Sequence, residues 1–150
     1  MKTVYFPSKY VVNKVKVGDF DLFKQILDNN NYTSVDFSLK EIAQMHAFAI
    51  GEALQNTNIL SVSVSFNNLG PDGALAFIRA IKKTNILAVN LAGNMLGFDG
   101  VLQAFRYMVG TKIKTLFLAY NNIGPRSVSS VLSALGRHQI DIDLSHNKLW

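Results

Sequence analysis

The chain has 150 residues, of which 49% are hydrophobic and 17% charged, a composition typical of a folded globular protein rather than a disordered or fibrous one. This length predicts one domain with a substantial core. Because it has no cysteines, a disulfide scaffold, a catalytic thiolate and a cysteine-ligated metal are excluded. The net charge of +5 permits an anionic partner but does not require one.

The N-terminus lacks the apolar run of a signal peptide, and no segment approaches the roughly 18–20 apolar residues that a membrane-spanning helix needs. A chain without cysteines also suits a reducing compartment. We therefore expect a soluble, cytoplasmic protein.

The N-terminal part of the chain is the least regular. The segment "YVVNKV" places Tyr10, Asn13 and Val15 in a degenerate copy of a pattern that recurs downstream. A plain N-terminal strand, or a hairpin that turns at Pro7, explains the same residues equally well. A helix is expected over residues 19–29, where apolar residues recur at helical spacing.

From residue 32 onward one pattern, apolar-x-apolar-x-x-Asn-x-apolar, repeats every 26 or 27 residues. Its asparagines are Asn67, Asn94, Asn121 and Asn147, and its apolar positions are Val62, Val64 and Leu69; Val89, Leu91 and Leu96; Leu116, Leu118 and Ile123; Ile142, Leu144 and Leu149. An upstream copy, "SVDFSLKEI", has Lys40 in place of the asparagine. We therefore divide the chain into an N-terminal cap or degenerate repeat, residues 1–31, and about four repeats, residues 32–150, the last incomplete.

Helical spacing of apolar residues follows each copy of the pattern. The expected buried stripes are Ala74, Leu75, Ile78 and Ile81; Val101, Leu102, Phe105 and Met108; Val128, Leu132 and Leu135. Asp72 and Asp99 precede glycines where these helices are expected to start, so their carboxylates are candidates to cap the first free N–H groups.

A strand and a helix in each repeat cannot bury their apolar faces alone, so the repeats must stack. Strands joined through helices run parallel, with a right-handed crossover. Parallel strands lie about 4.8 Å apart, whereas packed helices need roughly 8–10 Å, so the stack must curve. The sequence predicts an α/β solenoid: a short horseshoe arc with the strands on the concave side and the helices on the convex side.

The repeated asparagines fit this arc as structural residues. Where each strand ends and the chain turns, backbone groups inside the solenoid need partners, and an inward amide offers two donors and an acceptor. We expect Asn67, Asn94, Asn121 and Asn147 to form a ladder that ends at Lys40, near the N-terminal cap.

The segment "ILSVSVSFNNLGPDGALAFIRAIKKTN" resembles a leucine-rich repeat of the ribonuclease-inhibitor-like class, with "NNLG", "NMLG" and "NNIG" as its most similar parts. The departures are valines and phenylalanine in place of leucines, and Lys40 in place of asparagine. The resemblance implies a non-catalytic scaffold that binds a protein, as an adaptor, an inhibitor or an effector of an intracellular bacterium. An effector would act in the host cytosol.

Side chains between the apolar positions are expected on the concave face, because strand residues alternate between two faces. The first strand-face row is Ser34, Ser61, Ala88, Thr115 and Asp141. The second row is Asp36, Ser63, Asn90, Phe117 and Asp143. The third row is Ser38, Ser65, Ala92, Ala119 and Ser145. The pre-asparagine row is Leu39, Phe66, Gly93, Tyr120 and His146.

The C-terminal half of this face is the richer in residues that dominate protein interfaces. We expect a protein partner to dock on Phe117, Tyr120, Asp141, Asp143 and His146, with Phe66 and Asn90 beside them. The alternative is that both aromatic rings only cover their strand neighbours and that the aspartates are solvated.

The sequence ends at "DIDLSHNKLW", a strand without a following helix. Three explanations stay open: Trp150 folds back as a small cap, two chains pair through Leu149 and Trp150 as a homodimer, or the sequence is a piece of a longer protein.

Other functions have weaker support. His46, His138 and His146 stand at different positions of the repeat, and no acid or serine is spaced to complete a catalytic triad, so we expect no catalysis, cofactor or metal. The basic residues are divided between the expected helices and the N-terminal stretch, away from the aspartates of the strand face. A weak contact with an anion or a nucleic acid through these residues is the remaining alternative.

Overall fold

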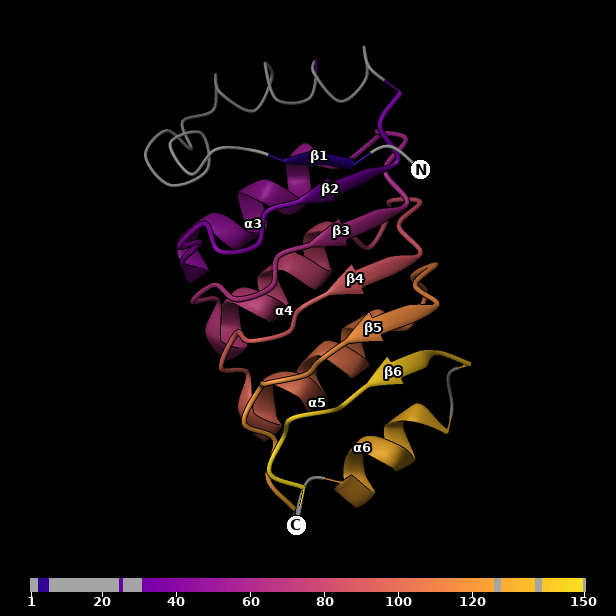
Figure 1. The fold of residues 1–150 in the computed structure, drawn as a ribbon. Helices are drawn as coiled ribbons and strands as arrows, with labels where there is room; N and C mark the ends of the chain where they lie inside the picture. The colour runs from indigo at the N-terminus through magenta and orange to yellow at the C-terminus, as the bar shows by residue number, and fades with distance from the viewer. Residues whose placement is uncertain (1–2, 6–24, 26–30, 126–127, 137–138, 150) are drawn as a thin grey trace.

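The computed structural model describes residues 3–5, 25, 31–125, 128–136 and 139–149. Its elements, in chain order, are β1 (Thr3–Tyr5), β2 (Ser34–Asp36), α3 (Gln44–Ala53), β3 (Ser61–Ser63), α4 (Gly70–Ala80), β4 (Ala88–Asn90), α5 (Gly97–Met108), β5 (Thr115–Phe117), α6 (Val128–Leu135) and β6 (Asp141–Asp143). The strands form one layer and the helices a second layer behind it (Figure 1).

The sheet has six strands in the order β1-β2-β3-β4-β5-β6, and each strand pairs with its neighbour in parallel. From β2 onward each pairing aligns equivalent positions of successive repeats, for example Val62 with Val89 and Val89 with Leu116. This register places the members of each strand-face row side by side. The predicted α/β solenoid, a short arc of alternating strands and helices, is confirmed.

The core lies between the two layers. The apolar positions of the repeat are almost fully buried from β2 to β5: Val62 and Val64 are 1% exposed, and Leu91 and Leu116 are 0% exposed. In the last repeat Ile142, Leu144 and Leu149 are only partly buried against the core. The difference follows from position, because in the sheet as described β6 has a neighbour on one side only.

The helix stripes confirm most of the predicted burial. Ile78 of α4 and Phe105 of α5 are 0% and 1% exposed. The prediction for Leu132 of α6 is wrong, because this side chain is 56% exposed and Val131 beside it is the buried residue. Leu132 occupies the repeat position of Ile78 and Phe105, but α6 packs against α5 alone among the described helices, so that flank of α6 faces solvent. The side chains of Val128 and Leu135 lie outside the described residues.

The predicted helix caps are also wrong. The N-caps of α4 and α5 are Leu69 and Leu96, and neither helix has a side-chain cap hydrogen bond. Asp72 and Asp99 lie three residues after these N-caps, in the first helical turn. There a carboxylate still interacts favourably with the positive end of the helix dipole.

The predicted asparagine ladder is confirmed, although it runs through the backbone rather than from amide to amide. The Nδ2 group of Asn121 donates to the carbonyl oxygens of Leu118 and Ala119 in its own repeat, at 3.1 and 3.2 Å, and of Leu91 in the preceding repeat, at 2.9 Å. Its Oδ1 atom accepts from the Asn94 N–H at 3.0 Å. Asn67, Asn94 and Asn147 make the same kinds of bond.

The ladder starts at the predicted place within the described structure. Asn67 accepts hydrogen bonds from the backbone N–H groups of Lys40 and Ile42 at 2.9 and 3.0 Å. Lys40 therefore takes part through its backbone. Asn94 and Asn121 are fully buried, and Asn67 is 5% exposed, so these amides have no access to water as a substitute partner.

The expectations for the N-terminal part fall almost wholly outside the described residues. These include the degenerate pattern at residues 10–15, the hairpin at Pro7 and all of the helix at residues 19–29 except the helical Gln25. β1 pairs in parallel with β2. The division of the chain at residue 31 stays a prediction. In the described part of the chain no helix has the length and apolarity needed to cross a membrane.

Candidate recognition surface

Four of the five residues in the second strand-face row accept a hydrogen bond from the backbone just after their strand ends. Oδ1 of Asp36, Asn90 and Asp143 accepts a hydrogen bond from the N–H group two residues further on, at 2.7, 3.0 and 2.8 Å. The hydroxyl of Ser63 does the same more weakly, at 3.4 Å. These are the bonds of Asx and related turns. Phe117 interrupts the series, because its side chain has no acceptor to offer.

Serine hydroxyls extend this network near β2 and β3. The hydroxyl of Ser38 lies 2.7 Å from that of Ser63 and 2.8 Å from that of Ser65, and it also donates to the Asp36 carboxylate. The N-terminal half of the face is thus held by hydrogen bonds within the protein. Its strand side chains are small, and its large exposed apolar groups are Leu39 and Phe66 at the strand ends, which are 73% and 46% exposed.

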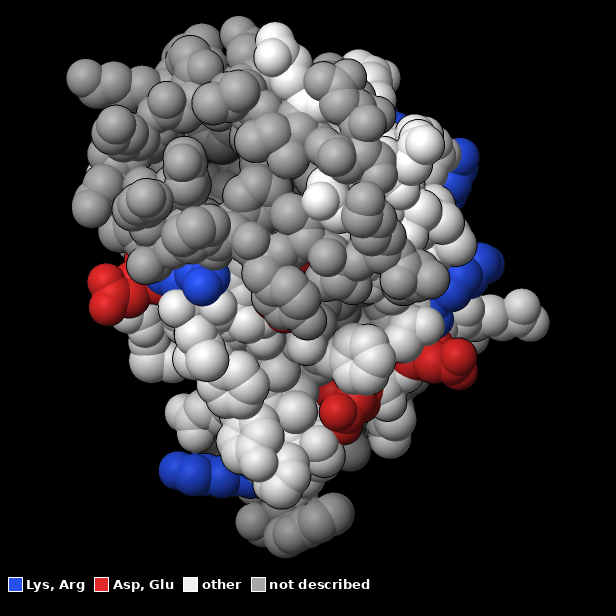
Figure 2. All heavy atoms as spheres, turned by 45° about the horizontal axis from the view of Figure 1, so that its top comes forward, with Lys and Arg blue, Asp and Glu red and all other residues white. Residues whose placement is uncertain are grey.

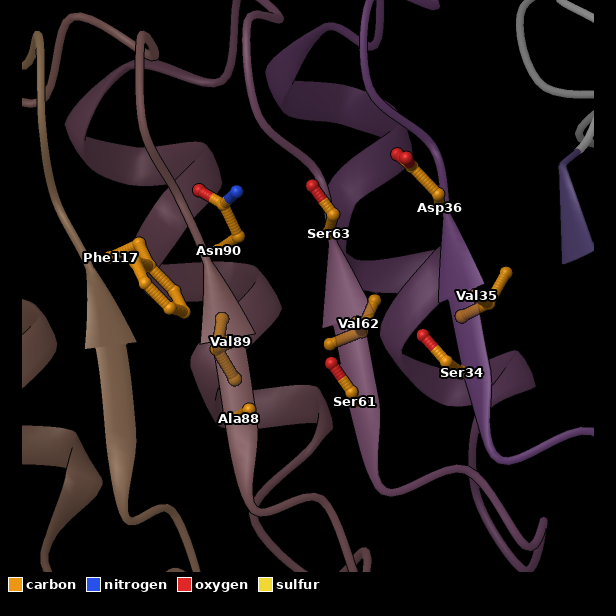
Figure 3. Close-up of a pocket in the computed structure, with 10 residues that line it drawn as sticks. All are labelled: Ser34, Val35, Asp36, Ser61, Val62, Ser63, Ala88, Val89, Asn90 and Phe117. Carbon is orange, nitrogen blue, oxygen red and sulfur yellow. The ribbon is translucent and has the colours of Figure 1, made fainter. Parts of the chain in front are cut away.

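A shallow hollow of about 250 Å³ lies across the strand face, lined by residues of β2 to β5. Figure 3 shows Asp36, Ser63 and Asn90 in line along the ends of three strands. Phe117 bounds the hollow on the β5 side, and its ring inclines from β5 toward Asn90 and Val89 of β4 (Figure 3). With 39% of its surface exposed, Phe117 partly covers β4 and also presents an aromatic face to solvent.

The pre-asparagine row has an unusual backbone. Leu39, Phe66, Gly93, Tyr120 and His146 all have positive φ, between 51° and 66°. For a residue other than glycine this conformation costs roughly 1–2 kcal/mol. It is held in place by hydrogen bonds to the next repeat: the N–H group of Phe66 donates to Ala92 O at 2.7 Å, and that of Tyr120 to Ser145 O at 3.3 Å.

The left-handed backbone directs large side chains outward in one line. The rings of Tyr120 and His146 stack with their centroids 4.2 Å apart and their planes 5° from parallel. The rings of Phe66 and Tyr120 lie 5.8 Å apart although a repeat separates them. This is possible because Gly93 stands between them and has no side chain. The result is an exposed aromatic stack, formed by Phe66, Tyr120 and His146, beside the hollow.

The two aspartates of β6 border the same region. Register places Asp143 next to Phe117, and Asp141 next to Thr115. Hydrogen bonds from the backbone N–H and the hydroxyl of Ser145 hold the pKa of Asp143 below its usual value, and the charge of nearby His146 adds a smaller effect in the same direction. Partial burial opposes this shift. The Asp143 carboxylate therefore stays ionised at neutral pH.

The structure brings the predicted site residues together in two lines. Asn90, Phe117 and Asp143 are neighbours in the second row, and Phe66, Tyr120 and His146 form the aromatic stack. Asp141 stands apart, at the start of β6 in the first row. Asn90 and Asp143 also have a structural task that sequence reasoning missed, namely the turn bonds at the strand ends. The alternation of Asp, Ser and Asn at one repeat position was the available signal.

The two histidines that the structure describes lie in different parts of the fold. His46 lies in α3 and its Nδ1 atom is buried without a hydrogen-bond partner, whereas His146 lies in the aromatic stack; His138 is outside the described residues. Within the described ranges, no group of three or more histidine, aspartate or glutamate side chains could hold a metal ion. The expectation that the protein is not an enzyme stays a prediction.

Comparison with known proteins agrees with the repeat. Residues 55–77, which run through β3 and Asn67 into α4, match the model of the leucine-rich repeat. No curated protein matches the chain. The matched segment is one copy of the repeat, and the same succession of strand and helix continues on either side of it.

Proposed function

We propose that the concave strand face is a protein-recognition surface and that the chain works as a non-catalytic interaction module. One observation carries the proposal: Phe66, Phe117 and Tyr120, which lie in or just after strands of one sheet, are 46%, 39% and 49% exposed. Exposed aromatic rings on a preorganised scaffold are the groups that contribute most to protein interfaces. Of the other predicted residues, Asp143 is the strand neighbour of Phe117 and His146 stacks on Tyr120, whereas Asp141 lies at the start of β6.

Rigidity supports this role. The strand ends are held by turn bonds, and the pre-asparagine row is held by bonds to the next repeat, so these rings need little ordering when a partner binds. Less ordering means a smaller entropic cost of association. Surface leucines such as Leu132 of α6 stand singly and are ordinary for a soluble domain.

The assignment to one class of leucine-rich repeats rests on the length of the repeat. We infer the ribonuclease-inhibitor-like class of leucine-rich repeats, because the period is 27 residues and helices of 10 to 12 residues fill α3, α4 and α5. An adaptor or effector role in a cytoplasm, including a host cytosol, is consistent with a small binding module that has no cysteines. The division into a cap at residues 1–31 and repeats at 32–150 belongs to the same proposal.

Affinity capture with paired variants tests the function. We expect Phe117→Ala combined with Tyr120→Ala to lose the partner proteins that the unchanged chain retains. The matched control is Phe48→Ala, which removes an aromatic ring that is 52% exposed on α3, in the helix layer. Retention of every partner by the double variant, with its circular dichroism unchanged, would show that the strand face is not the binding surface.

Self-association through the C-terminal end is the second candidate. The edge of β6 is unpaired in the described sheet, which favours strand addition, and Leu149 lies beside it. Antiparallel pairing of two β6 strands would however place Asp141 of one copy opposite Asp143 of the other, and like charges in such pairs are destabilising. Light scattering of the unchanged chain and of Trp150→Ser over a concentration series decides the question: we expect a monomer for both, and a dimer lost on substitution would support pairing.

Basic residues give less support to an anion-binding function. In the view of Figure 2 lysines and arginines lie apart from one another at the margins, with acidic residues among them. Of the helix-borne cations, Arg79 is already placed over the Tyr107 ring, 4.7 Å from its centroid. A nucleic-acid surface needs such residues gathered on one face.

A further inference from the structure

The strand face differs in charge from the rest of the molecule. The chain has a net charge of +5, yet none of the three strand-face rows contains a lysine or arginine. The same rows contain Asp36, Asp141 and Asp143. A concave surface of one sign concentrates the field of its charges, and it attracts ligands of the opposite sign.

These carboxylates are not neutralised within the described structure, where no ion pair joins them to a lysine or arginine. Asp36 and Asp143 each use Oδ1 for the turn bond at their strand end, which fixes the side chain and leaves Oδ2 for another donor. Asp141 is exposed at the start of β6. Asp36 and Asp143 are therefore preorganised for a cation supplied from outside, and Asp141 is accessible to one.

The aromatic ring in the second row adds a second reason for a cation. Phe117 has Asp143 as its strand neighbour on one side and the hollow on the other. A guanidinium group can lie over an aromatic ring and at the same time donate paired hydrogen bonds to a carboxylate. The combination of an exposed ring and adjacent carboxylates favours arginine over an apolar or anionic group.

The row also fits an extended chain. Asp36 and Asp143 stand at its two ends, four strand spacings apart, which is about 19 Å at 4.8 Å per strand. An extended polypeptide rises about 3.3 Å per residue, so this span corresponds to about six residues. Between the two ends, Ser63 and Asn90 supply hydroxyl and amide groups that can bond to the backbone or side chains of such a segment.

We propose that the strand face binds an extended, arginine-bearing segment of a partner protein across the second row, with guanidinium groups at Asp141, Asp143 and Phe117 and a further cation at Asp36. This rests on the proposed recognition function and names the chemistry of the partner. A nucleic acid is disfavoured on this face, because phosphates would meet the same carboxylates.

Fluorescence anisotropy with a labelled peptide of alternating arginine and alanine tests the proposal. The comparison peptide has citrulline at every arginine position, which keeps the shape and removes the charge. We expect saturable binding of the arginine peptide at low salt, weaker binding at physiological salt, and at least about tenfold weaker binding of the citrulline peptide.

Two triple variants that remove the same number of negative charges then show which face of the protein binds the peptide. Asp36→Asn, Asp141→Asn and Asp143→Asn together remove the strand-face charges, while the amide oxygens can still accept the turn bonds, as Asn90 does. The matched triple Glu52→Gln, Asp72→Asn and Asp99→Asn removes as many exposed charges from α3, α4 and α5. We expect the first triple to weaken binding about fivefold more than the second, and Phe117→Ala to weaken it about threefold.

Equal loss of binding in the two triples, or equal binding of both peptides, would overturn the proposal, provided that circular dichroism shows both triples folded. These results are separate from the capture experiment. If the Phe117 and Tyr120 variant loses a partner while the arginine peptide fails to bind, the cationic specificity is wrong and the recognition surface stands. If the peptide binds the strand face while capture is unaffected, the proposed function fails.

Discussion

The ring of Phe66 occupies the place where a side chain on Gly93 would stand. A Cβ atom on Gly93 would lie 2.4 Å from Cδ1 and 2.7 Å from Cε1 of that ring. The glycine is therefore needed twice, for its positive φ of 66° and for the close approach of the ring. This relationship lets the aromatic stack continue past a repeat that contributes no side chain.

Gly93→Ala is expected to destabilise the fold by about 2 kcal/mol, of which about 1 kcal/mol arises from the left-handed backbone and the rest from displacement of the ring. In a Phe66→Ala background only the backbone part should remain. Urea unfolding of the two single variants and the double variant measures this coupling. Gly124→Ala is the control, with open space around the added methyl group and an expected change within about 0.5 kcal/mol. An identical cost of Gly93→Ala in both backgrounds would show that the ring does not rest on the glycine.

Asn121→Ala removes a fully buried amide and leaves several backbone groups without partners. Each orphaned buried group costs about 1–3 kcal/mol, so we expect a loss of about 3 kcal/mol or more in the free energy of unfolding. Asn147→Ala should cost less, because water can reach that partly exposed site. Asn68→Ala, at an exposed neighbour of the ladder, serves as the control. A cost for Asn121→Ala no greater than that of the control would contradict the ladder's structural role.

Asn90→Ala should destabilise the protein by about 1 kcal/mol, because it removes the acceptor for the Ala92 N–H group. Asn90→Asp is expected to be nearly neutral, since Asp36 and Asp143 fill the same position with the same bond. Thermal unfolding at neutral pH distinguishes the two variants. If both changed stability equally, the side-chain acceptor would not be what the second row requires.

Acid should remove the contribution of Asp143 to stability. Its pKa in the folded state is lowered from 3.8, chiefly by the hydrogen bonds of Ser145. A depressed carboxyl pKa stabilises the fold above the unfolded-state pKa, and that stabilisation is lost as the pH falls through the folded-state value. Between about pH 6 and pH 3 the unchanged chain should therefore lose more stability than Asp143→Asn, which keeps an acceptor and cannot titrate. Parallel pH profiles for the two proteins would contradict this assignment.

The sequence predicted the repeat, the strand register and the ladder because these follow from spacing. Each buried strand position recurs at nearly constant intervals, so one repeat such as that of Val62 and Asn67 locates the others. Helix starts were less predictable. Asp72 resembled a cap in the sequence, but the helix already begins at Gly70, which has a positive φ of 63°, and this places the aspartate inside the first turn.

Two outcomes, one in the candidate site and one in the helix layer, depended on features that local sequence patterns do not reveal. Large residues such as Phe66 and Tyr120 seldom adopt positive φ, so only Gly93 hinted that this position is left-handed. The exposure of Leu132 could not be read from helical spacing, since the same spacing buries Phe105 where another helix follows. Burial at the end of a stack depends on neighbours rather than on the residue itself.

Photo-cross-linking from the strand face is the most direct test of the recognition surface. A benzophenone amino acid replaces Phe117 in one variant and Phe48 of α3 in the other, and both variants are irradiated in the protein's native cells. The account predicts a cross-linked protein partner from position 117, none from position 48, and loss of the product when excess unsubstituted chain competes. Cross-links from position 48 alone, or equally from both positions, would contradict recognition by the strand face.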